Sequence, residues 1–215
     1  MAGAFAELVR GPLKNDQAEA AANIKIVLIE AGPRLLPSFS PALSDRTKKD
    51  LEKLGVQVML NTAVEEVTND AIKINGAPEI PAQVTIWAAG VKGEPTASKL
   101  NLPLISTRID VENSLQVKNY PHIWAIGDIN GSKGKDGRFY PMVAPVALQQ
   151  GKWVAKQILR KHEGKALQPF KYRDKGSMTT IGRHKAVVEV RNFRMTGPLA
   201  WFAWLFLHLF YLLGG

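Results

Sequence analysis

Residues 24–33 read IKIVLIEAGP, and this stretch sets the fold class of the chain. The run Ile24–Ile29 is short and rich in β-branched residues, which is typical of a buried β-strand. Gly32 and Pro33 are turn residues, so they mark where the strand has ended. Glu30 therefore lies at the carboxyl end of the predicted strand.

The segment that follows completes a parallel unit. Ser44–Leu54 carries apolar residues at helical spacing, and Gly55 is placed to end the helix. Val56–Leu60 is again an apolar strand. A strand, a helix and a second strand in this order predict a right-handed parallel crossover. We therefore expect an α/β fold with parallel sheets.

Other segments extend this alternation on both sides. Met1–Arg10 is expected to be a helix whose small residues (Ala2, Gly3, Ala4 and Ala6) allow close packing on a sheet. Gly11 and Pro12 are expected to end it, and Lys14–Asn23 is expected to be a surface loop. Later patterns predict a hairpin of Val64–Val67 and Ala71–Ile74, and strands at Val84–Ala88 and Ile123–Ile126. They also predict a helix from Pro141 to about Lys161. Strands within Thr179–Val190, turning near Gly182, and a helix at Pro198–Leu213 are expected to follow.

The charge and the cysteine count limit the classes of function. The formal net charge is +9, which is compatible with nucleic acid, anionic lipid or anionic cofactors as partners. Helix-turn-helix, zinc-spacing and aromatic ribonucleoprotein patterns are absent from the sequence, so no nucleic-acid partner is expected. The chain contains no cysteine, which excludes disulfides, thiolate metal sites and a redox dithiol. No metal site is expected.

Two strand ends in the first half carry residue types that dinucleotide-binding units use. An acid in the position of Glu30 accepts hydrogen bonds from both hydroxyls of an adenine ribose and repels a 2′-phosphate, which favours NADH over NADPH. A solvated strand-end acid is the alternative interpretation. Ala89 and Gly90 follow the strand Val84–Ala88, and their small size lets a nicotinamide or flavin edge approach the backbone. Alone this signal is weak, because glycine ends many strands.

The second half contains a sharper pattern, IWAIGD over residues 123–128. It places Gly127 and Asp128 just beyond a buried strand, where a carboxylate can bind a hydroxyl of a flavin's ribityl chain. A turn or helix-capping aspartate is the alternative. The helix expected to open at Pro141 follows, and its unpaired N–H groups can stabilise the negative charge of a reduced flavin.

Three polar side chains near these patterns are further candidates. Gln149 and Gln150 can reach a flavin ring or the carbonyl of an acceptor, although a pair of glutamines on a helix is more often plain surface. Lys185 begins an apolar strand and can hydrogen-bond a flavin or quinone oxygen. A solvated lysine in a turn is its alternative interpretation.

The helix Pro198–Leu213 contains no Asp, Glu, Lys or Arg. At 1.5 Å per residue it reaches about 24 Å, which is shorter than the ~30 Å hydrocarbon core of a bilayer. We expect this amphipathic helix to lie in one leaflet, helped by the basic stretch Arg183–Arg194. A buried core or dimer helix is the alternative, and His208 is expected to be a hydrogen-bonded packing residue. The membrane-binding candidates are Trp201, Trp204, Phe206 and Tyr211.

Taken in order, these segments resemble the type II NADH:quinone oxidoreductases of the FAD- and NAD-binding pyridine nucleotide-disulfide reductase superfamily. The resemblance rests on VLIEAGPRLLP at 27–37, WAAGV at 87–91, IGD at 126–128, APVALQ at 144–149, GRHKA at 182–186 and the apolar tail. It implies a flavoprotein with two dinucleotide-binding domains. It also implies transfer of electrons from NADH through FAD to a membrane quinone, as in a non-proton-pumping respiratory NADH dehydrogenase.

The resemblance assigns roles to the candidates of the first half and to the glycine–aspartate pattern. It implies that Glu30 binds the adenine ribose of NADH. It further implies that Ala89 and Gly90 lie near the nicotinamide, and that Gly127 and Asp128 hold the ribityl chain of FAD.

The resemblance also assigns roles near the reacting groups. It implies that Ala144, Pro145 and Val146 contact the isoalloxazine ring, and that Gln149 and Lys185 act catalytically near the flavin and the quinone. The family's quinone-site motif reads Ala-Gln-x-Ala-x-Gln, and Pro145 replaces its first glutamine, so a side-chain contact is lost there.

Three functional segments are implied. Residues 1–93 are the remainder of an NADH-binding domain, 94–162 the C-terminal segment of an FAD-binding domain, and 163–215 a strand pair with a membrane-anchoring helix. The glycine-rich phosphate-binding motifs are expected before Met1, so we expect an N-terminal truncation and poor FAD binding by the chain alone. The expected location is the cytoplasmic face of the cell membrane, as a peripheral (monotopic) protein, with a second copy of the chain as a candidate partner.

Two other functions are also compatible with the sequence. One is a soluble FAD-dependent NAD(P)H reductase of an iron–sulfur protein, for which the basic surface suits an acidic partner but the apolar tail has no purpose. The other is a cofactor-free, membrane-associated fragment.

Overall fold

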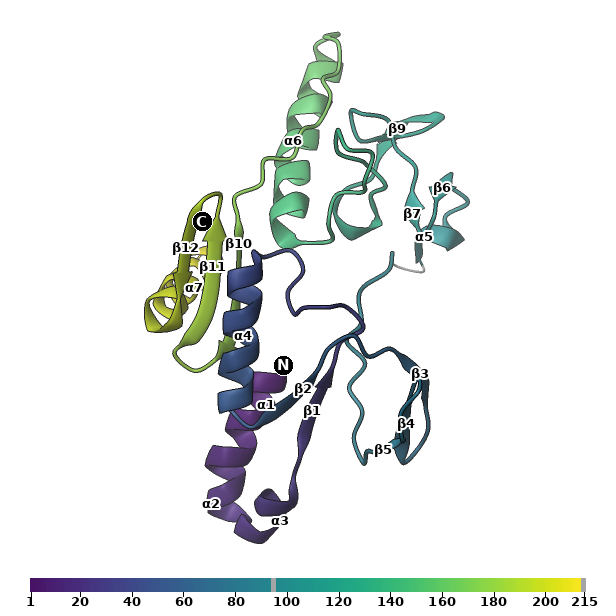
Figure 1. Cartoon of the computed structure of the whole chain (residues 1–215). Coiled ribbons are helices and arrows are strands. Elements are labelled where there is room, and N and C mark those ends of the chain that lie inside the picture. The colour runs from purple at the N-terminus through teal and green to yellow at the C-terminus, as the bar shows by residue number, and fades with distance from the viewer. Residues whose placement is uncertain (94–95, 214–215) are drawn as a thin grey trace. The chain divides into compact units, whose positions relative to one another are not determined.

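The computed structural model describes residues 1–93 and 96–213 and divides the chain into two compact units (Figure 1). The first unit joins residues 1–86 to the stretch from Gly176 onward, and the second is the continuous stretch 87–175. The three expected segments (1–93, 94–162 and 163–215) were defined by the cofactor or surface that each would bind. The two units are defined by packing and do not test those bounds, so the segments stay a prediction. Residue 94, where the second segment begins, lies outside the described residues, as do residues 214–215.

The N-terminal helix does not end where the sequence predicts. α1 (Ala2–Leu8) passes through a π-helical turn, Val9–Leu13, into the short helices α2 (Lys14–Asp16) and α3 (Ala18–Asn23). In a regular α-helix the ring of Pro12 would clash with the carbonyl one turn earlier, and the wider π turn relieves this clash. The predictions of a stop at Gly11-Pro12 and of a loop at 14–23 were therefore wrong.

The predicted parallel unit is confirmed. β1 (Ile26–Ile29) pairs in parallel with β2 (Val56–Met59), and α4 (Pro41–Lys53) connects them. The helix begins three residues earlier than expected, because a proline with its fixed φ fits the first turn of a helix and needs no N–H partner there.

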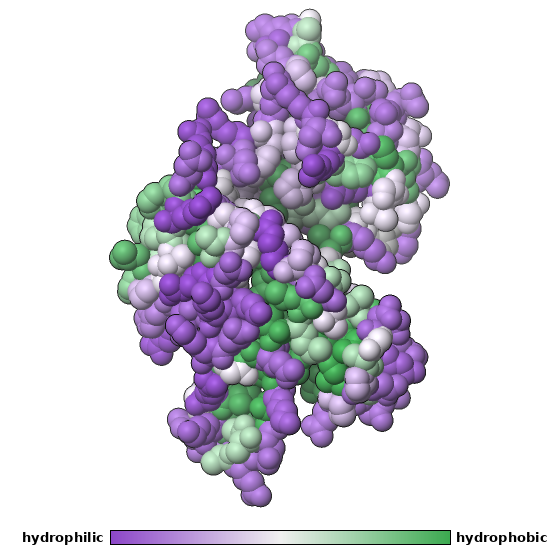
Figure 2. Space-filling model, in the orientation of Figure 1, coloured by the Kyte–Doolittle hydropathy of each residue, from purple (hydrophilic) through white to green (hydrophobic). Residues whose placement is uncertain are grey.

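Helix α4 shows why the first unit holds together. Its exposed side is hydrophilic (Figure 2), whereas its inner side carries the buried residues Leu43, Ser44, Thr47, Asp50 and Leu51. This inner side packs with α1, β2 and two later strands, β10 (Ser177–Gly182) and β11 (Lys185–Val190). The buried apolar cluster consists of Ala6, Leu35, Phe39, Leu43, Leu51, Val56, Ile181 and Val187.

The predicted close-packing face of α1 is confirmed for Gly3 and Ala6, whereas Ala4 is exposed. Gly3 and Ala6 are buried, and α1 contacts β1, β2 and β10. A Cβ atom added at Gly3 would lie 1.6 Å from the carbonyl oxygen of Ile181. The backbone of α1 can therefore approach β10 this closely only because residue 3 has no side chain.

Residues 64–88 contain one confirmed and one wrong prediction. β3 (Val64–Val67) and β4 (Ala71–Ile74) form the predicted hairpin, to which β5 (Ile80–Pro81) adds a short third strand. Val84–Ala88 is not a strand, and Val84, Ile86 and Trp87 are exposed. A strand needs a neighbouring edge to pair with, and in the described residues the parallel sheet consists of β1 and β2, neither of which pairs with this segment.

The end of the chain forms a sheet covered by a helix. β10 (Ser177–Gly182), β11 (Lys185–Val190) and β12 (Phe193–Thr196) are antiparallel neighbours, and α7 (Gly197–Leu212) packs on β11. The strands within 179–190, their turn and the helix were predicted, whereas β12 was not. None of the described helices is long and apolar enough to cross a membrane.

The second unit has short strands around one long helix. Its elements are α5 (Thr96–Lys99), β6 (Leu104–Ile105), β7 (Arg108–Ile109), β8 (Gln116–Val117), β9 (Tyr120–Trp124), the 3₁₀ helix η2 (Gly127–Ile129) and α6 (Ala144–His162). β9 ends two residues earlier than the predicted strand. α6 begins three residues later than predicted, because Val143 has an extended backbone.

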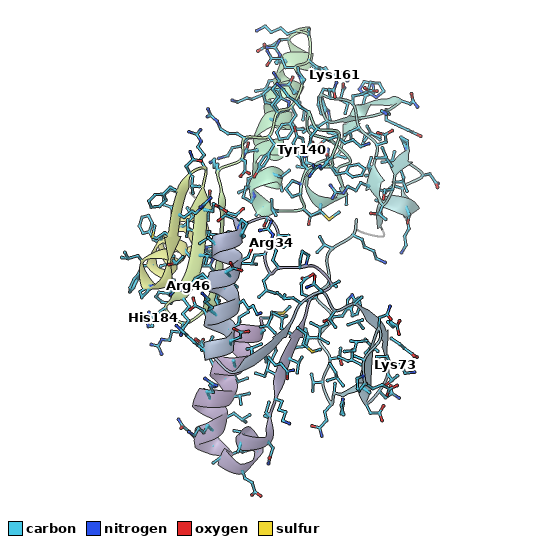
Figure 3. The ribbon with its side chains drawn as sticks, in the orientation of Figure 1. Arg34, Arg46, Lys73, Tyr140, Lys161 and His184 are labelled. Carbon is cyan, nitrogen blue, oxygen red and sulfur yellow. The ribbon has the colours of Figure 1, made fainter. Side chains whose placement is uncertain are left out.

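After α6 the chain returns along this helix without regular secondary structure. Buried Gln157 accepts the backbone N–H of Gln168 through Oε1 at 2.8 Å, which fixes the returning segment to the helix. Tyr140, labelled in Figure 3, contacts the rings of Phe170 and Tyr172 edge-on, at centroid distances of 5.6 and 5.7 Å. These contacts give the second unit an aromatic core.

Glu189 on β11 links three elements of the first unit. Its Oε2 accepts the N–H of Ser40 at 2.7 Å, just before α4, and its Oε1 accepts Nε of Arg194 on β12 at 2.8 Å. The hydrogen bond from Arg194, followed by that from Ser40, lowers the pKa of Glu189 below its ordinary value.

A depressed pKa in the folded state has a predictable effect on stability. The Glu189 carboxylate stabilises the fold above the unfolded-state pKa of about 4.3, and this contribution disappears as the pH falls through the lower, folded-state pKa. We expect Glu189→Gln to lower the melting temperature at pH 7 and to reduce the loss of stability between about pH 4.5 and 3. Thermal melts across this range check the expectation, with exposed Glu65→Gln as the control. Identical pH profiles for Glu189→Gln and the unchanged chain would contradict it.

Candidate functional site

Glu30 lies directly after β1, as predicted. Its N–H donates to the carbonyl of Met59 at 2.9 Å and its carbonyl accepts the N–H of Thr62 at 3.0 Å. Oε1 of its carboxylate accepts the N–H of Gly32 at 2.7 Å. In the part of the chain that the structure describes, Oε2 has no hydrogen-bond partner, so it can accept a hydrogen bond from a ligand hydroxyl.

Ala89 and Gly90 lie in the second unit on an exposed segment. The N–H of Gly90 donates to the carbonyl of Ala88 at 3.0 Å, and Gly90 has a φ of +97°. A Cβ atom added there would meet nothing within 4 Å. The open backbone that was predicted is present, but it does not follow a strand.

Gly127 and Asp128 form a turn whose conformation is fixed by buried amides. Gly127 has a φ of +72° and begins η2, and its N–H donates to Oε1 of Gln150 at 2.6 Å. Nδ2 of Asn130 donates to the carbonyl of Ala125 at 2.6 Å. Gln150 and Asn130 are 1% and 2% exposed, so both amides are held inside the unit.

Asp128 itself faces solvent, and its carboxylate accepts no hydrogen bond from the described residues. It interacts electrostatically with Arg108, which donates to the carbonyl of Tyr140 at 2.7 Å and lies 5.0 Å from the ring centroid of Phe139. Partial burial lowers the pKa of Arg108, and the attraction of Asp128 opposes this shift. An available carboxylate beside a fixed cation suits a hydroxyl-bearing ligand.

The start of α6 offers fewer free N–H donors than predicted. Pro145 has no N–H, and Val146 and Ala147 donate to the carbonyl of Val143 at 3.0 and 3.3 Å. In the first turn, Ala144 is left with an N–H that has no partner among the described residues. The side chain of Val146 is buried, so a ligand at this helix start would meet mainly Ala144 and Pro145.

Gln149 uses both ends of its side-chain amide within the second unit. Nε2 donates to the carbonyl of Arg173 at 2.9 Å, and Oε1 accepts the N–H of Arg173 at 3.0 Å. This pair of hydrogen bonds fixes the returning segment to α6. A contact between Gln149 and an acceptor molecule would require that clamp to open.

Lys185 begins β11 in the first unit and is half-buried, next to the turn in which His184 has a φ of +59°. The candidates therefore fall into two groups. Glu30 and Lys185 belong to the first unit, whereas 89–90, 127–128 and 144–149 belong to the second. Within the second unit, α6 contacts η2, so the structure brings the last two of these groups together.

Sequence reasoning undervalued Gln150 and missed Asn130 and Ser132. A signal was available for Gln150, because Val146, Gln150 and Val154 recur at intervals of four and so share one helical face. All three side chains are buried. A glutamine on an apolar face needs buried partners, and the turn at Gly127 supplies them.

The four membrane-binding candidates differ in exposure. Trp201 is partly buried, with its ring 4.7 Å from that of His184. Trp204 stacks on His208 at 4.0 Å, and Nδ1 of His208 hydrogen-bonds the carbonyl of Trp204 at 2.8 Å. His208 is therefore hydrogen-bonded as expected, but it is exposed, and the ring on which it stacks belongs to its own helix. Phe206 and Tyr211 are 72% and 41% exposed.

Comparisons with known proteins agree with the sequence resemblance. The sequence model of one protein family, described as pyridine nucleotide-disulphide oxidoreductase, matches residues 2–151. The type II NADH:quinone oxidoreductase NdhA of Mycobacterium tuberculosis is 35% identical over 204 residues, covering 88% of this chain and 42% of that protein. Ndh of the same organism is 32% identical over 231 residues, covering 100% and 48%. The chain thus spans somewhat less than half the length of these relatives.

Solved structures show the same fold. NDH2 from Plasmodium falciparum in complex with NADH matches with a TM-score of 0.83 at 19% identity, over 95% of this chain and 58% of that chain. The sulfide:quinone oxidoreductase of Aquifex aeolicus matches with a TM-score of 0.71 at 15% identity, over 97% and 53%. The α/β architecture is therefore shared with these two structures.

Proposed function

We propose, because this chain belongs to the pyridine nucleotide-disulphide oxidoreductase family, that it is part of an FAD-dependent enzyme that transfers electrons from NADH to a membrane quinone. The observation that carries the proposal is the 35% identity to a type II NADH:quinone oxidoreductase over nearly the whole chain. In the proposed enzyme, residues 1–93 bind NADH, 94–162 bind FAD, and 163–215 attach the protein to the membrane.

The residues present fit these two cofactors. Asp128 offers an exposed carboxylate to a ribityl hydroxyl, and Glu30 keeps one carboxylate oxygen for an adenine ribose. Ala144 and Pro145, at the exposed start of α6, would contact the flavin ring beside buried Val146, and Gly90 would lie near the nicotinamide. When FAD is bound, it supplies the two-electron chemistry that links NADH to the quinone.

The chain's own residues would orient and stabilise the reactants. A carboxylate at Glu30 favours a free 2′-hydroxyl over a phosphate and hence NADH over NADPH. Lys185 is proposed to donate a hydrogen bond to a flavin or quinone oxygen. Gln149 would hydrogen-bond the quinone after its side chain releases the backbone of Arg173. If these hydrogen bonds persist, Gln149 would instead contribute by fixing the segment around Arg173 to α6.

We also propose that α7 binds the cytoplasmic face of the cell membrane without crossing it. Its outer side chains are large and apolar: Phe206 and Leu212 are 72% and 81% exposed, and Leu213, directly after the helix, is 88% exposed. Burial of such side chains in the lipid interface is favourable. The basic turn Arg183–Lys185 lies beside Trp201, where it can face anionic headgroups. A second copy of the chain is the competing partner for this surface.

Asp128→Asn tests the cofactor assignment. The variant keeps the size of the side chain but removes its charge. A hydrogen bond to a charged acceptor is stronger than one to a neutral acceptor, so FAD should bind about 10- to 100-fold more weakly. Flavin fluorescence titration would measure this, with the chain alone and with the N-terminal half of NdhA supplied. Asp136→Asn is the matched control, since Asp136 is an exposed aspartate that accepts the N–H of Arg138 within its own loop.

Two results would contradict the proposal. One is a chain that binds no FAD under either condition, and the other is equal FAD affinity in Asp128→Asn and the control. If the loaded protein oxidises NADH but reduces a small iron–sulfur protein and no quinone, the soluble reductase is the correct function.

A further inference from the structure

A closed hydrogen-bond network surrounds the turn that carries Asp128. Oε1 of Gln150 accepts the N–H of Gly127 at 2.6 Å, while its Nε2 donates to Oδ1 of Asn130 and to Oγ of Ser132, both at 3.2 Å. Oδ1 of Asn130 also accepts the N–H of Ser132 at 2.8 Å. Each polar group of the Gln150 side chain thus has a partner, and that side chain is almost completely buried.

The orientation of the Gln150 amide is fixed by chemistry. The backbone N–H of Gly127 can only donate, so the side-chain atom that faces it must be the oxygen. The nitrogen then necessarily faces Asn130 and Ser132. A side chain that fits this position must therefore accept on one side and donate on the other.

The network joins the turn to helix α6. Gln150 is on the second turn of α6, and residues 144–146 at the start of the same helix are the proposed contacts of the flavin ring. Ala147 lies on α6 between residues 144–146 and Gln150. Its Cβ atom is 3.7 Å from where a Cβ atom of residue 127 would lie, so the helix and the turn are in van der Waals contact. The two proposed flavin contacts consequently share one rigid support.

We propose that Gln150 is a positioning residue for flavin binding, which holds the turn at Gly127 so that the carboxylate of Asp128 faces the ribityl chain. This inference rests on the proposed binding of FAD. Gln150 does not touch the cofactor in this arrangement. It acts through the N–H of Gly127, whose left-handed backbone has no other side-chain partner among the described residues.

Two variants at residue 150 separate positioning from packing. Gln150→Met keeps the length but cannot hydrogen-bond, so exchange of the Gly127 amide proton should become at least about tenfold faster and FAD affinity should fall about tenfold. Gln150→Glu behaves differently with pH, because a buried glutamic acid has a raised pKa. Near pH 5 the protonated acid both accepts and donates, so it should restore most of the flavin affinity.

At pH 8 the ionised form of Gln150→Glu should lose that affinity. Its carboxylate still accepts from Gly127 but repels the oxygens of Asn130 and Asp128. Arg108, the cation that interacts with Asp128 from β7, is charged at both pH values and so does not produce the difference. The unchanged chain, measured at the same two pH values, gives the baseline.

Gln157→Glu is the matched control for both measurements. Gln157 lies on the same helix, is 0% exposed and likewise accepts a backbone N–H, that of Gln168. Its replacement should lower thermal stability but leave Gly127 exchange and the pH profile of flavin affinity unchanged. A general destabilisation of the second unit would instead change both variants alike.

The possible outcomes distinguish this inference from the proposed function. The positioning role is overturned if the amide proton of Gly127 exchanges at an unchanged rate in folded Gln150→Met. It is also overturned if the variants that exchange this proton faster bind FAD as tightly as the unchanged chain. Failure of the unchanged protein to bind FAD at all overturns the proposed function, whereas the exchange measurement would still report whether Gln150 holds the turn. If Gln150→Met does not fold, the pH response of Gln150→Glu decides.

Discussion

The double variant Phe206→Asp/Phe210→Asp is expected to bind lipid vesicles about a thousandfold more weakly than the unchanged chain. The two rings are 72% and 53% exposed and lie one helical turn apart on α7. Burial of each in the lipid interface contributes about 2 kcal/mol, and a tenfold change in partitioning corresponds to about 1.4 kcal/mol. The cost of bringing a carboxylate to an apolar surface adds to this effect.

The fold should survive this double substitution. The face of α7 that packs on the sheet is formed by Gly197, Ala200 and Trp201, against Ala186 and Val188. Phe206 and Phe210 do not belong to that cluster, so the melting temperature should change little.

Sedimentation with vesicles of phosphatidylcholine and phosphatidylglycerol measures the binding. The control is Val84→Asp/Leu159→Asp, which changes two side chains outside α7 that are 79% and 63% exposed. Equal binding of both double variants would refute the membrane assignment. A dimer of the unchanged chain that dissociates in Phe206→Asp/Phe210→Asp, without vesicle binding by either protein, would show that a second copy covers α7.

Gly3→Ala is expected to destabilise the first unit by about 3 kcal/mol. The new methyl group would overlap the carbonyl oxygen of Ile181, 1.6 Å away. A backbone carbonyl cannot rotate aside as a flexible side chain can, so α1 must move away from β10. The buried cluster that contains Ala6 and Val187 would then lose packing.

Gly11→Ala is the matched control, because a Cβ atom at Gly11 meets nothing within 4 Å. Alanine favours helical backbone over glycine by about 1 kcal/mol, so this variant should be neutral or slightly more stable. Urea denaturation followed by circular dichroism compares the two. Equal midpoints would mean that α1 does not pack on β10 in solution.

The sequence predicted best those elements whose pattern is local. The hairpin of residues 64–74, helix α4 and helix α7 each carry their own periodicity, and their bounds were found to within three residues. The close-packing face of α1 followed from glycine and alanine alone. Pro12 misled the prediction, because a proline normally ends a helix and the π turn that accommodates it has no separate sequence signature.

The other wrong or missing predictions concern features that depend on distant partners. Val84–Ala88 has the composition of a strand, but composition does not supply an edge to pair with. β12 contains arginine and methionine, and it is a strand because β11 lies beside it. The candidate residues at 30, 127 and 128 were proposed from a local pattern, a strand end followed closely by glycine, and their places after β1 and at η2 agree with it. The partners of Gln149 and Gln150 depend on how loops return to α6, which sequence spacing does not encode.

The first unit is assembled from the two ends of the chain, and this arrangement constrains how it is made. On a ribosome, β10, β11 and α7 emerge only after the whole of residues 87–175, a delay of several seconds at about 5–20 residues per second. During that interval Ala6, Leu43, Leu51 and Val56 lack the strands that complete their cluster. The contiguous second unit can fold while it waits, so the nascent chain should expose the unfinished apolar surface of the first unit to chaperones until synthesis of the last strands.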